Sequence, residues 1–254
     1  MKIGIYGDSY TAPHGDFHTP TNWYNALADM LSKDANTEVA INHHGKGASS
    51  VYYTYRKFLD TSYENDLNVV LISGPQRFPH IVELSVPGNT QAFTCKEQVQ
   101  GSIETLDNIL TDSDRVKLNN VIGWFDATKK EDQYFIDMSD LMISKIEECS
   151  KTILYPCFSD SFTPERFKKH KLDKDIHFMH SLWVRQLEVM GIEVNNFSAQ
   201  ETDKLCGHLV PEFNLFFANM VFKKIKTGKW DNTGFFDVTI KEPRKIYYNN
   251  YKHE

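Results

Sequence analysis

Ser9 and His208 are the two side chains of this chain that best suit nucleophilic catalysis. Ser9 ends a Gly-Asp-Ser tripeptide that directly follows the first apolar run, residues 3–6. Serine is a weak nucleophile until a neighbouring base takes its proton, and histidine is the usual base. His208 comes shortly before Pro211, where an apolar helical pattern begins, so we expect it on a loop that faces a pocket. Taken alone, Asp8 and Ser9 also fit the cap of a helix, and His208 fits a surface histidine.

Attack on a carbonyl creates an oxyanion, so we also expect fixed hydrogen-bond donors beside Ser9. Gly47 follows the second apolar run and, having no side chain, allows its backbone to approach a ligand closely. Gln76 follows the third apolar run and offers a side-chain amide, while Arg77 beside it suits an anionic substrate group. Together with Asp8, these residues form the polar set that we predict around the oxyanion and the substrate.

Short apolar runs that alternate with amphipathic stretches predict the elements that position these residues. The alternation favours an α/β fold, a three-layer α/β/α sandwich with a flavodoxin-like parallel sheet of about five strands. The carboxyl ends of parallel strands gather ligands at one edge of the sheet, so residues that follow successive strands are expected to meet there. We expect strands at residues 2–6, 38–42, 68–73 and 152–156, with a weaker pattern at 192–194.

Helical spacing of apolar residues fills the intervals between these strands. The first helix is expected over residues 23–31, after Pro20 and with Thr21 as its cap. Further helical patterns cover residues 50–59, 131–149, 177–190 and 211–225.

Two stretches depart from this alternation within what we interpret as a single domain over residues 1–254. Residues 76–130 contain Pro79, Pro87 and Gly88, and we expect an irregular excursion over the strand ends that forms a lid or substrate wall. Residues 231–254 form an aromatic tail, which we expect to pack on its own domain. An edge strand or an oligomer contact, and hence a homo-oligomer, is the alternative for the tail.

Composition sets the class of protein. The chain has 254 residues, of which 41% are hydrophobic and 24% charged, as in an ordinary globular protein with a real core. The net charge of −6 gives no general attraction to nucleic acid, and the basic run at 168–171 is interpreted as a solvated helix end. We see neither a signal peptide nor a membrane span, and the four cysteines are scattered, so we expect free thiols and a cytoplasmic location.

Four short blocks, in order along the chain, resemble those of the SGNH hydrolases, also called GDSL-type esterases and lipases. With their flanking residues they span residues 5–218, so the resemblance covers most of the chain. The blocks are Gly7-Asp8-Ser9, residues 42–49 with Gly47 in the oxyanion position, Gly74-Pro75-Gln76, and His208 with its following Leu-x-Pro-Glu run.

The resemblance implies a serine esterase that uses no metal or other cofactor. Ser9 would attack the ester carbonyl, His208 would act as the general base, and the amides of Ser9 and Gly47 would hold the oxyanion with a side chain of the third block. A small-molecule ester is implied as the substrate, with a carbohydrate O-acetyl ester as one option.

Two departures from the family pattern motivate an alternative function. Gln76 stands where the family has asparagine, and Leu205 stands where it usually has the aspartate that orients the histidine. Asp203 could orient His208 if the loop bulges; otherwise a backbone carbonyl would do so and leave a Ser-His dyad. The alternative is therefore a catalytically weakened module of the same fold that binds a protein or a carbohydrate.

A metal site is a further, less favoured interpretation of the segment after Ser9. His14, Asp16 and His18 lie close together in the sequence, and with Asp8 they provide metal-binding side chains. We interpret this segment instead as a polar loop on the substrate side.

Overall fold

The structure of the chain is a computed structural model. It describes residues 1–8, 10–11, 22–46, 49–74, 80–85, 90–93, 96–128, 132–157, 164–170, 172, 179–189, 209 and 211–240.

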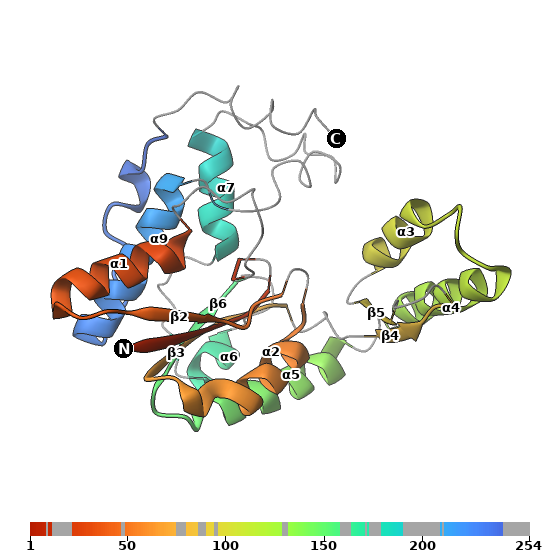
Figure 1. Cartoon of the computed structure of the whole chain (residues 1–254), viewed down its shortest axis with the longest axis horizontal. Helices are drawn as coiled ribbons and strands as arrows, with labels where there is room; N and C mark the ends of the chain where they lie inside the picture. Colours follow the sequence, from red (N-terminus) through yellow and green to blue (C-terminus); the bar gives the residue numbers. More distant parts are fainter. Residues whose placement is uncertain are drawn as a thin grey trace.

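A four-stranded parallel sheet forms the centre of the molecule, in the order β2-β1-β3-β6 (Figure 1). β1 runs from Lys2 to Tyr6 and lies between β2 (Ala40–His43) and β3 (Leu67–Ile72). β6 (Thr152–Pro156) pairs with the outer side of β3. All but the first residue of β1 and of β3 are buried, which explains their continuous apolar runs. The expected strands are confirmed to within two residues at each end, and the pattern at 192–194 lies outside the described residues.

Helices cover both faces of this sheet, which confirms the predicted three-layer α/β/α class. In the view of Figure 1, α1 (Trp23–Ala35), α7 (Met179–Val189) and α9 (Pro211–Thr227) lie above the sheet. On the lower side are α2 (Val51–Thr61), followed by the short helix η1 (Ser62–Glu64), α5 (Asp132–Glu147) and α6 (Pro164–Lys169). The main hydrophobic core joins the strands to both layers through side chains such as Ile5, Leu27, Val70, Ile143 and Phe217.

The start of α1 differs from the prediction. Asn22, not Thr21, occupies the cap position, and its side chain makes no capping hydrogen bond. The N–H of Trp23 instead donates to Oδ1 of Asn214, a residue of α9, over 3.2 Å. A side chain from a distant helix therefore satisfies one of the first backbone N–H groups of α1, which have no partner within the helix, and local sequence cannot show this.

The described residues between 80 and 128 form strands and helices, in a part of the chain where we expected an irregular excursion. An antiparallel hairpin of β4 (His80–Glu83) and β5 (Thr90–Phe93) precedes α3 (Lys96–Thr105) and α4 (Asp112–Thr128). Figure 1 shows this hairpin and these helices projecting from the sheet at the right. They have a hydrophobic cluster of their own, made of Val82, Leu84, Phe93, Val99, Leu110, Leu118 and Val121.

Asp114 explains why this unit is ordered despite its turn-forming residues. Its carboxylate accepts hydrogen bonds from the backbone N–H of Thr111 and, at the end of the hairpin, from the backbone N–H of Ser85. Its own N–H donates to Oγ1 of Thr111, which completes a capping box at the start of α4. Hydrogen bonds hold the pKa of Asp114 well below its ordinary value, and the one from the hydroxyl of Thr111 contributes most.

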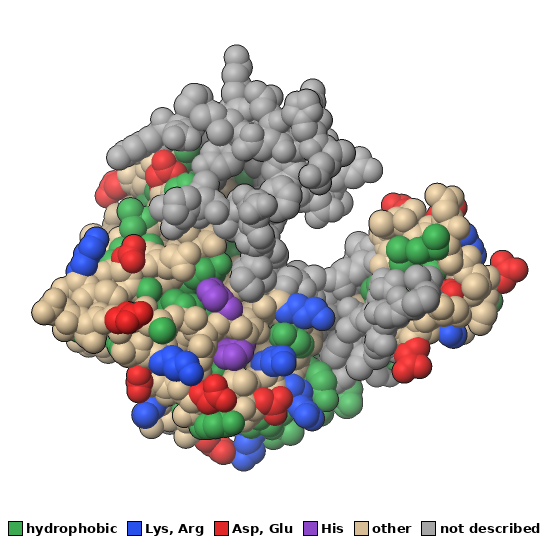
Figure 2. All heavy atoms as spheres, in the orientation of Figure 1, with side chains coloured by type: hydrophobic (Ala, Val, Ile, Leu, Met, Phe, Trp, Pro, Cys, Tyr) green, Lys and Arg blue, Asp and Glu red, His purple; other side chains and the backbone are tan. Residues whose placement is uncertain are grey.

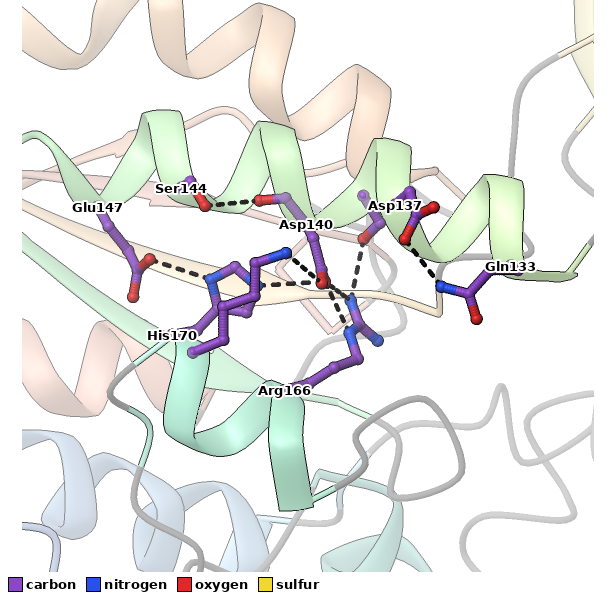
Figure 3. A network of polar contacts seen from close by, with 9 residues as sticks. Gln133, Asp137, Asp140, Ser144, Glu147, Arg166 and His170 are labelled. Carbon is purple, nitrogen blue, oxygen red and sulfur yellow. Dashed lines mark hydrogen bonds and ion pairs between the residues drawn. The ribbon is translucent and has the colours of Figure 1, made fainter.

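A charged network joins α6 to α5 (Figure 3). Arg166 Nε donates to Asp140 Oδ1 over 2.7 Å, and Lys169 Nζ donates to Oδ2 over 2.9 Å. The ring of His170 is buried and lies 3.1 Å from Asp140 and 3.0 Å from Glu147 through its two nitrogens. Burial raises the pKa of Asp140, but the hydrogen bonds from Lys169 and Arg166 outweigh burial and leave the pKa below its ordinary value. The predicted solvated helix end is therefore wrong for His170.

The described surface and the start of the tail complete the fold. Figure 2 shows Lys, Arg, Asp and Glu side chains interspersed over the described part of the face in view. Within the ranges given above, no helix has both the length and the apolar character needed to cross a membrane.

Phe235, in the short helix η4 (Phe235–Asp237), is buried in the main core. Residues 231–240 thus pack on their own domain as expected, and residues 241–254 lie outside the described part.

Candidate active site

The carboxyl ends of β1, β2 and β3 lie side by side, and the first three blocks begin there. β1 is followed by β2 on one side of the sheet and β3 is followed by β6 on the other, so the connections from the adjacent strands β1 and β3 leave in opposite directions. Such a switch point is where open α/β sheets bind their ligands. The strand order therefore places the start of the turn that carries Ser9 at this switch point.

Gly7 brings the end of β1 into close contact with β3. Its φ of +147° is a conformation that favours glycine, and a Cβ built there would lie 2.9 Å from both Cβ and the carbonyl oxygen of Leu71. The chain then turns back on itself, because the carbonyl of Asp8 accepts hydrogen bonds from N–H and Oγ1 of Thr11 over 3.0 and 2.7 Å.

Asp8 is fully buried, and its carboxylate faces the turn. The Oδ1 atom accepts a hydrogen bond from the backbone N–H of Tyr10 over 3.2 Å, as in an Asx turn. The carboxylate thus bridges the residues on either side of Ser9. Its predicted role toward the oxyanion and the substrate stays a prediction.

Ser49 connects the three strand-end loops, and the sequence analysis did not single it out. Its Oγ donates to the carbonyl of Gly7 over 3.0 Å, and its own carbonyl accepts a hydrogen bond from Ser73 Oγ over 3.3 Å. The N–H of Lys46 donates to the same Gly7 carbonyl over 3.1 Å. A small hydroxyl residue after each of the strands β2 and β3, which flank β1, was the signal that could have pointed to this contact.

The segment of the fourth block is linked to the first block through α1. The side chain of Asn214 donates from Nδ2 to the carbonyl of Leu209 over 2.6 Å and accepts from the N–H of Trp23 at Oδ1. The indole Nε1 of Trp23 donates to the carbonyl of Tyr10 over 2.8 Å. Leu209 directly follows His208 in the sequence, and Tyr10 directly follows Ser9. The immediate neighbours of the predicted base and nucleophile therefore share one hydrogen-bonded chain.

His43 and His44 at the end of β2 are further imidazoles at this edge. The ring of His43 meets the ring of Tyr24 edge-on at 4.4 Å, and that of His44 stacks on Tyr6 at 4.8 Å. Burial lowers the pKa of both histidines, although a hydrogen bond with the backbone of Thr11 partly opposes this for His43. Burial thus favours neutral rings in the folded state, and their aromatic contacts suit packing.

Six of the seven predicted site residues lie outside the described residues, and only Asp8 lies within them. The six are Ser9, Gly47, Gln76, Arg77, Asp203 and His208. The metal-binding interpretation of His14, Asp16 and His18 also falls outside. The structure describes the residues that hold the strand-end loops, and the predicted chemistry of these six side chains remains a prediction.

Comparison with known proteins returns only structural similarity. No family model and no curated protein matches the chain. The fold is similar to a lipase/acylhydrolase from Enterococcus faecalis, with a TM-score of 0.41 and 15% identity over 91% of this chain and 97% of that one. It is also similar to the psychrotrophic esterase EstA from Pseudoalteromonas sp., with a TM-score of 0.39 and 12% identity over 89% and 97% of the two chains.

A lipolytic protein of the G-D-S-L family from Desulfitobacterium hafniense DCB-2 is similar at a TM-score of 0.35 and 12% identity, over 87% of this chain and 98% of that one. These names belong to the class of enzymes that the four sequence blocks resemble. At such TM-scores and identities, the similarity by itself assigns neither a family nor a function.

Proposed function

We propose that this chain is a serine esterase of the SGNH type, with Ser9 as its nucleophile. The observation that carries the proposal is the hydrogen bonding that joins the segments of all four blocks. Ser49 joins the loops that follow β1, β2 and β3, and the Asn214–Trp23 pair connects the residue after His208 to the residue after Ser9. These contacts hold the four segments together at one end of the sheet, where the proposed reaction needs their side chains to meet.

In the proposed reaction, His208 takes the proton of Ser9 Oγ as that oxygen bonds to the ester carbonyl carbon. The backbone amides of Ser9 and Gly47 and the side chain of Gln76 stabilise the oxyanion. When the tetrahedral intermediate collapses, the bond to the alcohol oxygen breaks and the proton on His208 passes to the departing alcohol. Water, deprotonated by His208, then attacks the acyl carbon. The bond to Ser9 Oγ breaks, His208 returns the proton to this oxygen, and the acid is released.

Asp203 is proposed to accept a hydrogen bond from the second ring nitrogen of His208; a backbone carbonyl is the alternative partner. Arg77 is proposed to bind an anionic group of the substrate. The substrate class is a small ester, and a carbohydrate O-acetyl ester is the specific version to test first, on the family resemblance of the sequence alone.

Labelling with a fluorophosphonate probe tests the nucleophile directly, because the probe forms a covalent bond with an activated serine. Wild-type protein is expected to be labelled, and Ser9→Ala is expected not to be. Ser113→Ala, which changes a serine of α4, is the matched control and should be labelled to the same extent as wild type. Absence of wild-type labelling, or equal labelling of Ser9→Ala, would contradict the proposal and favour the binding module.

Turnover of p-nitrophenyl acetate tests the base and its orienting partner. His208→Ala is expected to lower kcat by several orders of magnitude, because the proton of Ser9 then has no acceptor. Asp203→Asn is expected to lower kcat as well, and an unchanged rate in this variant would assign the orienting role to a backbone carbonyl instead.

A further inference from the structure

We infer that Asn214 and Trp23 are positioning residues that hold the proposed nucleophile and the proposed base at a fixed separation. The inference rests on the proposed function. It adds two residues that are not among the catalytic residues expected from the four sequence blocks. Neither residue is proposed to touch the substrate. Both act through the backbone of the residues next to Ser9 and His208.

The hydrogen bonds of Asn214 use both ends of its amide. Nδ2 donates to the carbonyl of Leu209, and Oδ1 accepts from the N–H of Trp23. A leucine has the same number of side-chain heavy atoms and would place only apolar groups in this buried position of α9. The amide therefore serves the two backbone groups that it binds, and packing alone does not require it.

Trp23 continues the connection toward the nucleophile turn. Its indole is 2% exposed and meets Phe217 edge-on at 4.9 Å, so α9 holds the ring in place. From that fixed ring, Nε1 donates to the carbonyl of Tyr10 over 2.8 Å. The ring thus has two functions, since its faces fill the core between α1 and α9 while its N–H anchors the turn.

The two residues together make α1 and α9 a rigid support between two loops. The N–H of Trp23 at the start of α1 has Asn214 as its partner in place of a local cap, so moving one helix start moves the other. Rates of proton transfer fall steeply when nucleophile and base are displaced by fractions of an ångström, and a displacement of about 1 Å can cost about a hundredfold. A network that sets this separation therefore affects kcat more than substrate binding.

The test compares Trp23→Phe and Asn214→Leu with Asn65→Ala in the full-length protein. Trp23→Phe keeps an aromatic ring and removes the N–H, and Asn214→Leu keeps the number of side-chain heavy atoms and removes the amide. Asn65 is another buried asparagine, but its hydrogen bonds lie near the amino end of β3. Each variant is first shown to be folded by circular dichroism at the assay temperature.

The readouts are the rate of fluorophosphonate labelling and the separate values of kcat and KM for p-nitrophenyl acetate. We expect about tenfold lower labelling and kcat for both positioning variants, with KM changed less than about twofold. Asn65→Ala is expected to keep the wild-type labelling rate and kcat although its stability falls.

Three outcomes separate the inference from the proposed function. Wild-type rates in folded Trp23→Phe and Asn214→Leu would overturn the positioning role while labelling at Ser9 upholds the esterase. Equal losses of kcat in Asn65→Ala would also overturn it, because the effect would then follow general stability. If wild-type protein is not labelled at Ser9, the proposed function fails and the positioning role fails with it.

Discussion

The two ends of the central sheet both contain buried hydrogen bonds, but at one end most of these bonds join side chains to one another. Near the amino end of β3, Asn65 donates to the hydroxyl of Tyr6 and to Oδ1 of Asn68, each over 2.9 Å, and accepts from Nδ2 of Asn42. We call these residues, with Thr61 on the Tyr6 hydroxyl, the amide cluster. At the carboxyl end, the side chains of Ser49, Ser73, Asn214 and Trp23 instead donate to backbone carbonyls of the loops.

This difference arises because different polar groups need hydrogen-bond partners at the two ends of the sheet. The amide cluster fills the space beside Gly4, where a Cβ would lie 2.7 Å from Oδ1 of Asn68. Its side chains bond to one another and, over 3.4 and 3.3 Å, to the carbonyls of Thr61 and Ser62. Loops that leave the strands have carbonyls without a partner in the sheet, so side chains must pair with them. Polar contacts at the amide cluster therefore stabilise the strands, whereas those at the carboxyl end hold the loops that carry the proposed chemistry.

The largest loss of stability is expected when the amide cluster is broken. Asn65→Ala removes a partner from Tyr6, Asn68 and Asn42, and we expect the free energy of unfolding to fall by about 3 kcal/mol. Urea unfolding measures this change. Asn219→Ala, which removes an exposed amide bonded within α9, is the matched control and should change stability by less than about 0.5 kcal/mol. A comparable loss in both variants would contradict the special role of the cluster.

A smaller loss of stability with a clear loss of activity is expected at the carboxyl end. Ser49→Ala removes the hydroxyl that joins the loops after β1 and β2, and we expect a loss of about 1 kcal/mol together with about tenfold slower fluorophosphonate labelling. Its neighbour Ser50 caps α2 by accepting from the N–H of Tyr53. Ser50→Ala should lose a similar stability of about 1 kcal/mol but keep its labelling rate. Equal labelling rates in Ser49→Ala and Ser50→Ala would contradict the distinction between contacts that hold the strand-end loops and contacts that only stabilise a helix.

The smallest effect concerns His44, whose ring stacks on Tyr6 and so links the end of β2 to the amide cluster. Burial, followed by the charge of Lys57, lowers the pKa of His44, and the charge of Glu64 only partly opposes them. The folded state therefore binds fewer protons than the unfolded state, and stability is lost as the pH falls below the unfolded pKa of about 6.5. The loss should be smaller than that caused by Ser49→Ala.

His44→Phe keeps the stacked ring and removes the titrating group, so it isolates this contribution. Urea unfolding at pH 7.5 and at pH 5.5 should show wild type losing more stability on acidification than the variant. His43, whose pKa is lowered chiefly by burial, is present in both proteins, so this burial effect cancels; only the smaller effect of the His44 charge on His43 is lost with the variant. Parallel pH profiles of the two proteins would show that His44 does not contribute.

Much of the central sheet could be predicted because its signals are local. The runs that became β1 and β6 have the predicted bounds, since strands buried on both faces need continuous apolar residues. The projecting unit at 80–128 was missed, because its two strands are only four residues long and proline and glycine obscured their pattern. Its regularity depends on Asp114, which bonds a residue 29 positions earlier.

In the candidate site, too, local features could be predicted from the sequence and contacts between distant residues could not. The Gly-Asp-Ser turn was visible in the sequence because glycine, an Asx turn and a preceding apolar run are all local features. The supporting contacts of Ser49, Trp23 and Asn214 were not, because each joins residues that are distant in the chain. A buried asparagine in a helix has no local pattern that distinguishes it from an exposed one.

The sequence by itself determined the alternation of strands and helices, the sharp turn at Gly7 and the types of side chain available for chemistry. These depend on the period of apolar residues and on backbone conformations that individual residues allow. Only the tertiary structure decided the strand order, which places the exits of β1 and β3 at one switch point, and the 191-residue separation that the Trp23–Asn214 hydrogen bond spans. The reason is physical: a buried polar group must find a partner wherever the fold provides one, and that partner is set by packing in space.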